Sequence, residues 1–259
     1  MQNNTFSTLF VGQNLIKLSE VDSTNNFLKV LVSNSEPLTE GTVIMADKQF
    51  AGRGQQDNIW HTEPGLNLTF SIYLKPSFLP VGKQFLLNMA VSIGIRNALQ
   101  RFVKEGIRIK WPNDIYFGHQ KMGGVLIENM LSGSTYKSTI IGIGINVNQL
   151  HFDSRKLKSA TSLKEILQQD VNLIELLAEI CSHIEKQYLQ LKAGGYSQLK
   201  DDYVRGLYKF NEPAVYRQNG EVIEGRITEV TESGLLGILR AGELRHYNFK
   251  EIEFLNNTP

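Results

Sequence analysis

Three short tracts of the sequence collect the residue types that can hold an anionic ligand. They are Ala51-Gly52-Arg53-Gly54-Gln55-Gln56-Asp57-Asn58-Ile59-Trp60, Lys110-Trp111-Pro112-Asn113-Asp114-Ile115 and Lys121-Met122-Gly123-Gly124-Val125-Leu126-Ile127-Glu128. Glycine lets the backbone approach a ligand closely and expose its N–H donors. Arginine and lysine add fixed positive charge, and arginine offers a planar donor fork that suits phosphate or carboxylate. Together the tracts predict a site that holds nucleotide phosphates against an anionic substrate.

Each tract taken alone also admits a purely structural interpretation. Gly52-Arg53-Gly54 is compatible with a glycine-rich turn that carries a solvated arginine. Lys110-Trp111-Pro112-Asn113-Asp114 is compatible with a strand–turn–strand in which Pro112 fixes the turn and the tryptophan packs inside. A lysine that begins a strand, as Lys121 does, is usually solvated, but this strand continues into apolar residues 125–127. The occurrence of all three tracts in one sequence favours a ligand-binding site over a purely structural role.

The glycine motifs differ from the standard nucleotide-binding fingerprints. After Gly52-Arg53-Gly54, position 57 is Asp and no helical pattern follows, so the dinucleotide fingerprint is excluded. Gly142-Ile143-Gly144-Ile145-Asn146 fails the same test, because Val147 stands where a third glycine is needed. The sequence has no Gly-Lys-Ser/Thr and hence no Walker A loop. Its five histidines show no zinc-ligand spacing, and we expect them to be structural or surface residues.

Composition limits the broad class of the protein. The chain has 259 residues, 41% of them hydrophobic, which is enough for one large domain and a small one. A net charge of +1 gives no support for a nucleic-acid or membrane surface role. The single cysteine, Cys181, excludes an internal disulfide, and its place on an apolar helical face predicts a buried inert thiol. The polar N-terminus does not resemble a signal peptide and no apolar run reaches membrane-spanning length, so we expect a cytoplasmic protein.

Hydrophobic periodicity predicts an α+β fold for residues 1–210. We expect strands at 15–18, 42–46, 67–74, 107–110, 115–117, 125–130 and 139–147, and a long loop at 49–66. We expect one helix with Asp22 or Ser23 as its N-cap, and further helices over 82–104, 172–192 and 197–207. Gly118-His119-Gln120 is typical of a hairpin turn.

Residues 211–259 have a different pattern. Short alternating segments at 214–218, 221–230, 235–240, 244–248 and 252–255 are separated by Asn219-Gly220, Ser233-Gly234 and Ala241-Gly242. Asn-Gly between two alternating runs is a strong hairpin signal. This pattern predicts a small β-barrel domain after the larger α+β domain, with its aromatic residues Tyr216, Tyr247, Phe249 and Phe254 in core alternation.

The ordered set of motifs resembles biotin protein ligase, that is biotin–[acetyl-CoA carboxylase] ligase. The resemblance runs from Ser23-Thr24-Asn25 through the three tracts to Gly142-Ile143-Gly144-Ile145-Asn146 and the C-terminal β segment, which is nearly the whole chain. It implies a mixed β-sheet with helices, of the type shared with class II aminoacyl-tRNA synthetases, followed by a small SH3-like barrel. It also implies a carbon–nitrogen ligase that uses ATP and Mg²⁺ to convert biotin into biotinyl-5′-AMP. A lysine of a biotin carboxyl carrier protein domain would then attack this mixed anhydride.

The resemblance also assigns roles to residues of this sequence. Arg53 and Lys121 would be the catalytic cations that contact the biotin carboxylate and the α-phosphate. The residues that would surround biotin are Ser23, Thr24, Asn25, Gln49, Gly52, Arg53, Gly54, Lys121, Gly123 and Gly124. The residues that would line the nucleotide side are Arg53, Gln55, Trp60, Lys110, Asn113, Asp114 and Asn146. Asp114 could meet Mg²⁺ through Mg-ATP, and no residue is firmly assigned as a metal ligand, in line with the preference of Mg²⁺ for few protein ligands.

The sequence departs from the family pattern in three places. Some members carry an N-terminal winged helix-turn-helix, but only 22 residues precede Ser23, so we expect no DNA binding. Gln55 stands where some members have a second arginine, which removes one phosphate contact and would ease the escape of biotinyl-AMP. Asp57 stands where glycine is usual, and its carboxylate would repel phosphate unless it faces solvent or metal. Related enzymes can form homodimers through a sheet edge, and the sequence leaves the oligomeric state of this chain open.

Three alternatives to the ligase remain. A lipoate–protein ligase or octanoyltransferase would share the fold, but those relatives carry Arg-Arg and triple-glycine tracts that this sequence lacks. A non-catalytic biotin or nucleotide sensor would be favoured by loss of Arg53 or Lys121, and both are present. A peptide-binding scaffold would use exposed aromatic residues of the barrel, whose spacing instead predicts a core.

Overall fold

A seven-stranded mixed sheet forms the centre of the computed structural model, which describes residues 6–34, 37–54, 58–133, 135–153 and 159–255. The strand order is β1-β2-β3-β7-β6-β5-β4, with β1 parallel to β2 and the other neighbours antiparallel. The strands are β1 (Leu15–Val21), β2 (Val43–Gln49), β3 (Leu68–Leu74), β4 (Ile107–Lys110), β5 (Asp114–Phe117), β6 (Gln120–Ser132) and β7 (Thr135–Ile145). The predicted mixed sheet with helices is confirmed.

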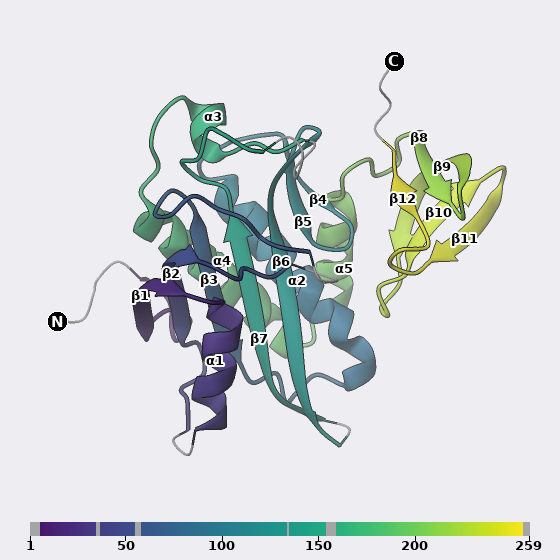
Figure 1. The fold of residues 1–259 in the computed structure, drawn as a ribbon. Coiled ribbons are helices and arrows are strands. Elements are labelled where there is room, and N and C mark those ends of the chain that lie inside the picture. The colour runs from purple at the N-terminus through teal and green to yellow at the C-terminus, as the bar shows by residue number, and fades with distance from the viewer. Residues whose placement is uncertain (1–5, 35–36, 55–57, 134, 154–158, 256–259) are drawn as a thin grey trace.

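Helices cover both faces of this sheet (Figure 1). One face carries α1 (Thr24–Ser33), which packs on β2, β3 and β7, and the other carries α2 (Gln84–Leu99), α4 (Leu173–Lys192) and α5 (Tyr196–Arg205). A short 3-10 turn, η2 (Val81–Lys83), precedes α2, and α3 (Leu163–Leu167) precedes α4. Gly94 brings α2 against α4, because a Cβ at this position would lie 2.8 Å from the Ile184 Cα.

The central strand β3 is buried along its whole length. Its apolar side chains Phe70 and Ile72 belong to the main core. Its polar side chain Ser71 faces α1 and lies within hydrogen-bond distance of Thr24 and Asn25. Burial of polar groups is stable only when they are hydrogen-bonded. The alternation of β3 therefore separates an apolar core from a satisfied polar network under the start of α1.

A second, antiparallel sheet of five strands follows in the order β11-β10-β9-β8-β12 (yellow and light green in Figure 1). Its strands are β8 (Ala214–Gln218), β9 (Glu221–Val230), β10 (Leu236–Arg240), β11 (Glu243–Tyr247) and β12 (Glu253–Phe254). Asn219-Gly220 and Ala241-Gly242 each have two consecutive positive φ angles, the geometry of type I′ hairpin turns. This sheet is consistent with the expected SH3-like barrel.

Three local predictions need correction. The helix predicted over 82–104 ends at Leu99, because Arg101 and Phe102 donate to carbonyls only three residues back and form a tight turn instead. Ser23 occupies the N-cap of α1, but its side chain makes no capping hydrogen bond. The short helix α3 was absent from the predicted elements, since five residues are too few to show helical periodicity.

Cys181 is completely buried in α4, as its position on the apolar face predicts. Burial raises the pKa of its thiol, with a smaller contribution from the nearby carboxylate of Glu185. The thiol is therefore inert towards oxidation and alkylation in the folded chain. Among the described segments, none of the helices has the length and apolar content to cross a bilayer.

Candidate functional site

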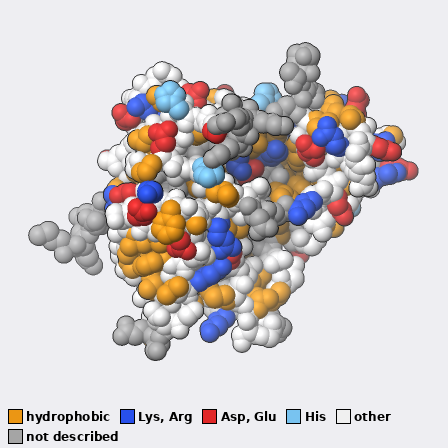
Figure 2. Space-filling view, in the orientation of Figure 1, with side chains coloured by type: hydrophobic (Ala, Val, Ile, Leu, Met, Phe, Trp, Pro, Cys, Tyr) orange, Lys and Arg blue, Asp and Glu red, His pale blue; other side chains and the backbone are white. Residues whose placement is uncertain are grey.

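A cavity of about 920 Å³ lies between the α1 side of the main sheet, residues 53, 54 and 58–61, and the end of the second sheet. Figure 2 shows the surface hollowed here, with hydrophobic and charged side chains along its walls. The lining residues are Ser23, Thr24, Asn25, Gln49, Arg53, Gly54, Asn58, Ile59, Trp60, His61, Phe70, Lys110, Trp111, Pro112, Asn113, Asp114, Lys121, Gly124, Val125, Leu126, Gly142, Ile143, Gly144, Phe249, Lys250, Ile252, Glu253 and Phe254. The three tracts found in the sequence thus meet in one cavity.

Glycines form the floor of the cavity where β6 and β7 pair. Gly124 lies opposite Gly144 in the register, and Gly142 lies two residues before Gly144 on the same face. A Cβ on Gly144 would overlap the Trp60 ring, and a Cβ on Gly142 would lie 2.5 Å from Asn25 Oδ1. The Gly142-Ile143-Gly144 motif therefore lets two side chains lie flat on the sheet, a role unrelated to a dinucleotide loop.

The end of the cavity beside α1 is rich in hydroxyl and amide groups. The backbone N–H and hydroxyl of Thr24 donate to Oε1 of Gln49 at 2.8 and 3.1 Å. Ser71 donates to Oδ1 of Asn25 at 2.5 Å, and its hydroxyl lies 2.7 Å from Oγ1 of Thr24. Ser23, Thr24 and Asn25 are each more than nine-tenths buried. This end can present both donors and acceptors to a polar ring.

The opposite end of the cavity carries an ion pair. Nζ of Lys121 on β6 lies 2.6 Å from Oδ1 of Asp114 on β5. Asn113 donates to the carbonyl of Val125 at 2.9 Å, and Asn88 and Tyr203 donate to the carbonyl of Pro112 at 2.8 and 2.6 Å. These bonds fix the turn between β4 and β5 and hence the position of Asp114. The pair holds a lysine that can exchange its partner for a ligand anion.

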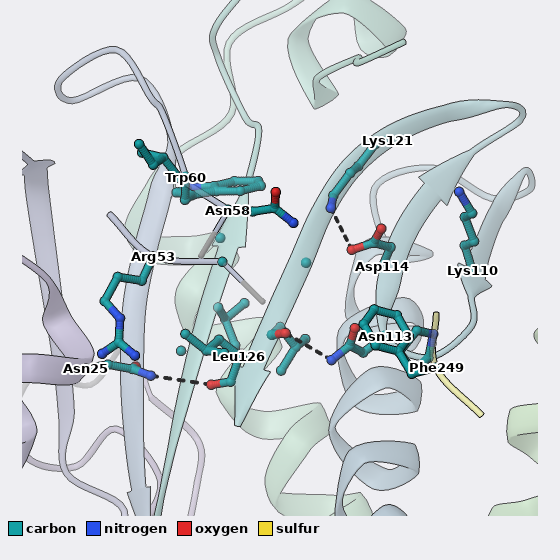
Figure 3. A pocket seen from close by; sticks show the side chains of 18 of the residues that line it. Asn25, Arg53, Asn58, Trp60, Lys110, Asn113, Asp114, Lys121, Leu126 and Phe249 are labelled. Carbon is teal, nitrogen blue, oxygen red and sulfur yellow. Dashed lines mark hydrogen bonds and ion pairs between the residues drawn. The ribbon is translucent and has the colours of Figure 1, made fainter. Parts of the chain in front are cut away.

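Arg53 lies on the other side of the cavity from Lys121 (Figure 3). Its guanidinium donates to Oε1 of Glu128 and to Oδ1 of Asn26, both at 2.8 Å. Arg53 forms an antiparallel bridge with Ile59, and next to it Trp60 N–H donates to the Gly52 carbonyl at 2.9 Å. The two cations selected from the sequence are therefore both paired with carboxylates and do not touch each other.

Lys110 closes the cavity towards the second sheet. Its ammonium lies 5.0 Å from the ring centroid of Tyr116 and 5.3 Å from that of Phe254. Burial lowers the pKa of Lys110, and the positive charges of Lys121 and Lys209 lower it further, against the opposing effect of Asp114. A partly desolvated cation framed by aromatic rings is suited to a planar or phosphorylated ligand.

Some residues selected from the sequence lie off the cavity wall. The amide of Asn146 donates to the Thr161 carbonyl at 3.1 Å, and Gly123 packs against the Gly144 carbonyl and Ile145 on the far side of the strand. Gly52 allows the backbone of Trp60 to approach, since a Cβ on Gly52 would overlap the Trp60 carbonyl. Gln55 and Asp57 lie outside the described residues. The remaining selected residues line the cavity.

Sequence reasoning missed the contribution of the second sheet. Phe249, predicted from its alternation to belong to the barrel core, lines the cavity instead, together with Lys250, Ile252 and Glu253. Phe254 packs against the core and the Tyr216 ring as predicted, and it also lines the cavity. Trp111 joins the two sheets, because its indole N–H donates to the Gly234 carbonyl at 3.0 Å and its ring contacts Phe249. His61 is an exposed residue at the rim of the cavity, as the expectation of a surface histidine allows. Alternation alone cannot distinguish a core position from one facing a neighbouring sheet.

The described residues do not fit a magnesium site held by the protein alone. Nowhere in the described ranges do three His, Cys, Asp or Glu side chains gather as metal ligands. The carboxylate of Asp114 is already engaged by Lys121. A magnesium ion would therefore have to arrive with the phosphates of a nucleotide.

Comparison with known sequences identifies relatives. The sequence profile of the Biotin/lipoate A/B protein ligase family matches residues 18–146. The bifunctional ligase/repressor BirA of Bacillus spizizenii is 33% identical over 205 residues, which cover 77% of this chain and 62% of that protein. The biotin–[acetyl-CoA-carboxylase] ligase of Paracoccus denitrificans is 25% identical over 86% of this chain and 92% of its own length. The chain therefore spans about three fifths of the length of BirA.

Comparison with solved structures gives the same result over a larger part of the chain. The biotin protein ligase of Aquifex aeolicus, solved in complex with biotin and ATP, aligns with a TM-score of 0.78 and 29% identity. The alignment covers 94% of this chain and 99% of that one. It therefore includes the second sheet as well as the segment matched by the profile. Together with the cavity geometry, these matches show that the chain belongs to the biotin/lipoate A/B protein ligase family.

Proposed function

We propose that this chain is a biotin–protein ligase, which converts biotin and ATP into biotinyl-5′-AMP and transfers the biotinyl group to a lysine. The observation that supports this proposal most directly is the single cavity that joins a buried hydroxyl and amide end to a lysine–aspartate end. Biotin has the matching polarity, with a cyclic urea at one end and a carboxylate at the other. The names of the relatives agree with this assignment.

Recognition of biotin is assigned to the end of the cavity beside α1. A cyclic urea has two N–H donors and one carbonyl acceptor, and a buried site must satisfy all three. Ser23, Thr24, Asn25 and Gln49 provide hydroxyl and amide groups of both kinds. Gly54 and Gly124 leave room for the ligand where side chains would fill it. Gly52 and Gly123 lie off the cavity wall, where they allow close backbone packing.

Adenylation is assigned to the end that carries Lys121. The biotin carboxylate attacks the α-phosphate, so two anions must approach and negative charge accumulates as pyrophosphate leaves. A fixed cation at this point stabilises the transition state more than the separate ground states. Lys121 is placed to do so once its pair with Asp114 is exchanged for the ligand. Arg53 would serve as the second cation after it leaves Glu128, and Trp60, Lys110, Asn113 and Asp114 would receive the nucleotide.

The second half-reaction requires a protein partner. The lysine amine of a biotin carboxyl carrier domain attacks the carbonyl of the mixed anhydride, an amide forms and AMP leaves. We propose a catalytic domain over residues 1–210 and a small β-domain over 211–259, which closes the nucleotide end with Phe249 and Phe254. Magnesium would accompany ATP as its counterion.

Biotin-dependent exchange of pyrophosphate into ATP tests the first half-reaction. Exchange with biotin, but not with lipoate or octanoate, would establish adenylation of biotin. Exchange with one of the other acids would keep the fold and reaction type but replace the substrate. Absence of exchange with every acid would overturn the ligase and favour a binding protein. Addition of a carrier domain should then consume the adenylate only if its acceptor lysine is present.

A further inference from the structure

Glu128 lies beside the amide end of the cavity and is bonded by three side chains from other elements. Its Oε2 accepts a hydrogen bond from Nδ2 of Asn25 at 2.8 Å. Its Oε1 accepts from Nζ of Lys29 at 2.7 Å and from the Arg53 guanidinium at 2.8 Å. These donors outweigh the effect of partial burial and lower the pKa of Glu128, so the carboxylate stays ionised.

The three bonds to Glu128 differ in how much they stabilise the local structure. Arg53 and Lys29 are 41% and 38% exposed, and ion pairs of such groups contribute little. Asn25 is 2% exposed, so its bond to Glu128 is made by a side chain with little access to water. A hydrogen bond from a buried group to a charged acceptor has the larger effect on structure.

The bond to Glu128 at 2.8 Å, with a longer one from the same Nδ2 to the Leu126 carbonyl at 3.4 Å, determines which way the Asn25 amide faces. An ionised carboxylate can only accept, so the NH₂ group of Asn25 must point to it and Oδ1 must point the other way. Oδ1 then lies over Gly142, where a Cβ would be 2.5 Å away, and accepts from Ser71. The Ser71 hydroxyl also lies 2.7 Å from Oγ1 of Thr24, and the Thr24 proton goes to Oε1 of Gln49, so the one proton of Ser71 faces two acceptors.

We propose that Glu128 is a positioning residue that fixes the donor and acceptor pattern of the biotin pocket through Asn25. This inference rests on the proposed function, because it assigns the pattern to recognition of a cyclic urea. The acceptor-only carboxylate holds the NH₂ group of Asn25, so Oδ1 of Asn25 is the acceptor that faces the Ser71 hydroxyl. The urea N–H groups then meet acceptors, and the amide of Asn25 cannot turn.

Glu128→Gln should reverse this pattern without a change of shape. Lys29 and Arg53 would keep the glutamine oxygen at the position of Oε1, which leaves the glutamine NH₂ facing Asn25. Asn25 would then turn its oxygen to the glutamine and its NH₂ to Ser71. We expect the KM for biotin in pyrophosphate exchange to rise about tenfold, with kcat changed less than about threefold.

A reciprocal exchange separates positioning from a general loss of structure. Asn25→Asp alone places two carboxylates side by side and should raise the KM for biotin about a hundredfold. In the variant that carries both Asn25→Asp and Glu128→Gln, the NH₂ group at position 128 donates to the carboxylate at position 25. The other oxygen of that carboxylate accepts from Ser71, so the KM should fall at least about tenfold below that of Asn25→Asp. Lys29→Met removes another partner of the same carboxylate and should leave the KM within about twofold of the wild type.

The outcomes are distinguishable. Thermal unfolding of each variant identifies any that fails to fold, and the comparison between Asn25→Asp and the double variant still tests the inference if Glu128→Gln is unstable alone. A wild-type KM in a folded Glu128→Gln variant, or no recovery in the folded double variant, would overturn the positioning role. Absence of biotin-dependent exchange in the wild type would instead overturn the proposed function, and this role with it.

Discussion

Lys121 and Asp114 form their ion pair directly above Gly124, with 2.6 Å between Nζ and Oδ1. A Cβ on Gly124 would lie 3.0 Å from the same carboxylate oxygen and 3.6 Å from Nζ, so the glycine provides the space for the pair. The paired lysine is 27% exposed and the aspartate 30% exposed. The cation is therefore held in place at the cavity wall but remains accessible to a ligand.

Lys121→Ala should abolish adenylation and leave the fold intact. Loss of a cation aimed at the developing charge should lower the exchange rate by about 10³-fold. The measurement is biotin-dependent pyrophosphate exchange, with circular dichroism as the test of folding. Lys164→Ala is a suitable control, because Lys164 pairs with the exposed carboxylate of Asp170 outside the cavity lining. Near-normal exchange by Lys121→Ala would remove this lysine from the catalytic residues.

Gly144→Ala should displace the Trp60 ring from the cavity floor, since the new Cβ would overlap the indole. We expect the KM for biotin or ATP to rise about tenfold and the tryptophan emission to shift towards longer wavelength as the ring gains exposure to water. Gly82→Ala serves as the control, because its Cβ would meet no atom within 4 Å. Unchanged emission and kinetics in Gly144→Ala would contradict the stacking of Trp60 on this glycine.

Lys110 should make ATP binding sensitive to alkaline pH. Burial lowers its pKa below the ordinary 10.5, so it loses its proton, and its attraction for phosphate, at a lower pH than an exposed lysine does. The KM for ATP should therefore rise as the pH approaches 10.5 from below. Burial disfavours the charged form of Lys110 in the folded state, so the contribution of this group to the free energy of unfolding increases through the same pH window. Circular dichroism at each pH separates the change in the KM from unfolding.

The variant Lys110→Arg tests whether Lys110 causes the rise in the KM for ATP at alkaline pH. Arginine keeps its charge throughout this range, so the rise in the KM for ATP should disappear in that variant. The measurement is the KM for ATP between about pH 7 and 10, at constant ionic strength. An unchanged profile in Lys110→Arg would show that another group titrates.

Glu185→Gln should destabilise the start of the chain. The carboxylate of Glu185 is 6% exposed and accepts the backbone N–H groups of Leu9, Phe10 and Val11 at 2.7, 2.8 and 2.9 Å. A glutamine NH₂ cannot accept, so at least one of these donors would lose its partner, at a cost of about 1–3 kcal/mol in the free energy of unfolding. Urea unfolding measures the loss, and Glu179→Gln on the exposed side of the same helix should cost less.

The order of elements and most of the cavity wall could be predicted because both depend on short-range patterns. Asn219, Gly220 and Gly242 adopt the positive φ angles that their residue types favour, and the strands on either side follow. The strand–turn–strand around Pro112 could also be predicted, since Pro112 and Asn113 are residue types that favour turns. Such features need no knowledge of the rest of the chain.

Partners from distant elements could not be predicted. Nothing near Arg53 in the sequence indicates that Glu128, 75 residues later, would hold its guanidinium. The position of Phe249 on the cavity wall depends on how the two sheets pack, which alternation along one strand does not encode. Gly142 and Gly144 are required because Asn25 and Trp60 pack against β7, and the sequence of β7 does not encode these two neighbours. Local pattern selects the candidates, and tertiary packing decides how they are used.

Burial of the single cysteine has a practical consequence for the study of this protein. Cys181 is the one native thiol in the sequence, and it is completely enclosed in α4 with a raised pKa. The wild-type chain should therefore react slowly with maleimides under native conditions. A cysteine introduced at an exposed position, such as Leu239→Cys on β10, would give site-selective attachment of a fluorophore or spin label without removal of a native residue.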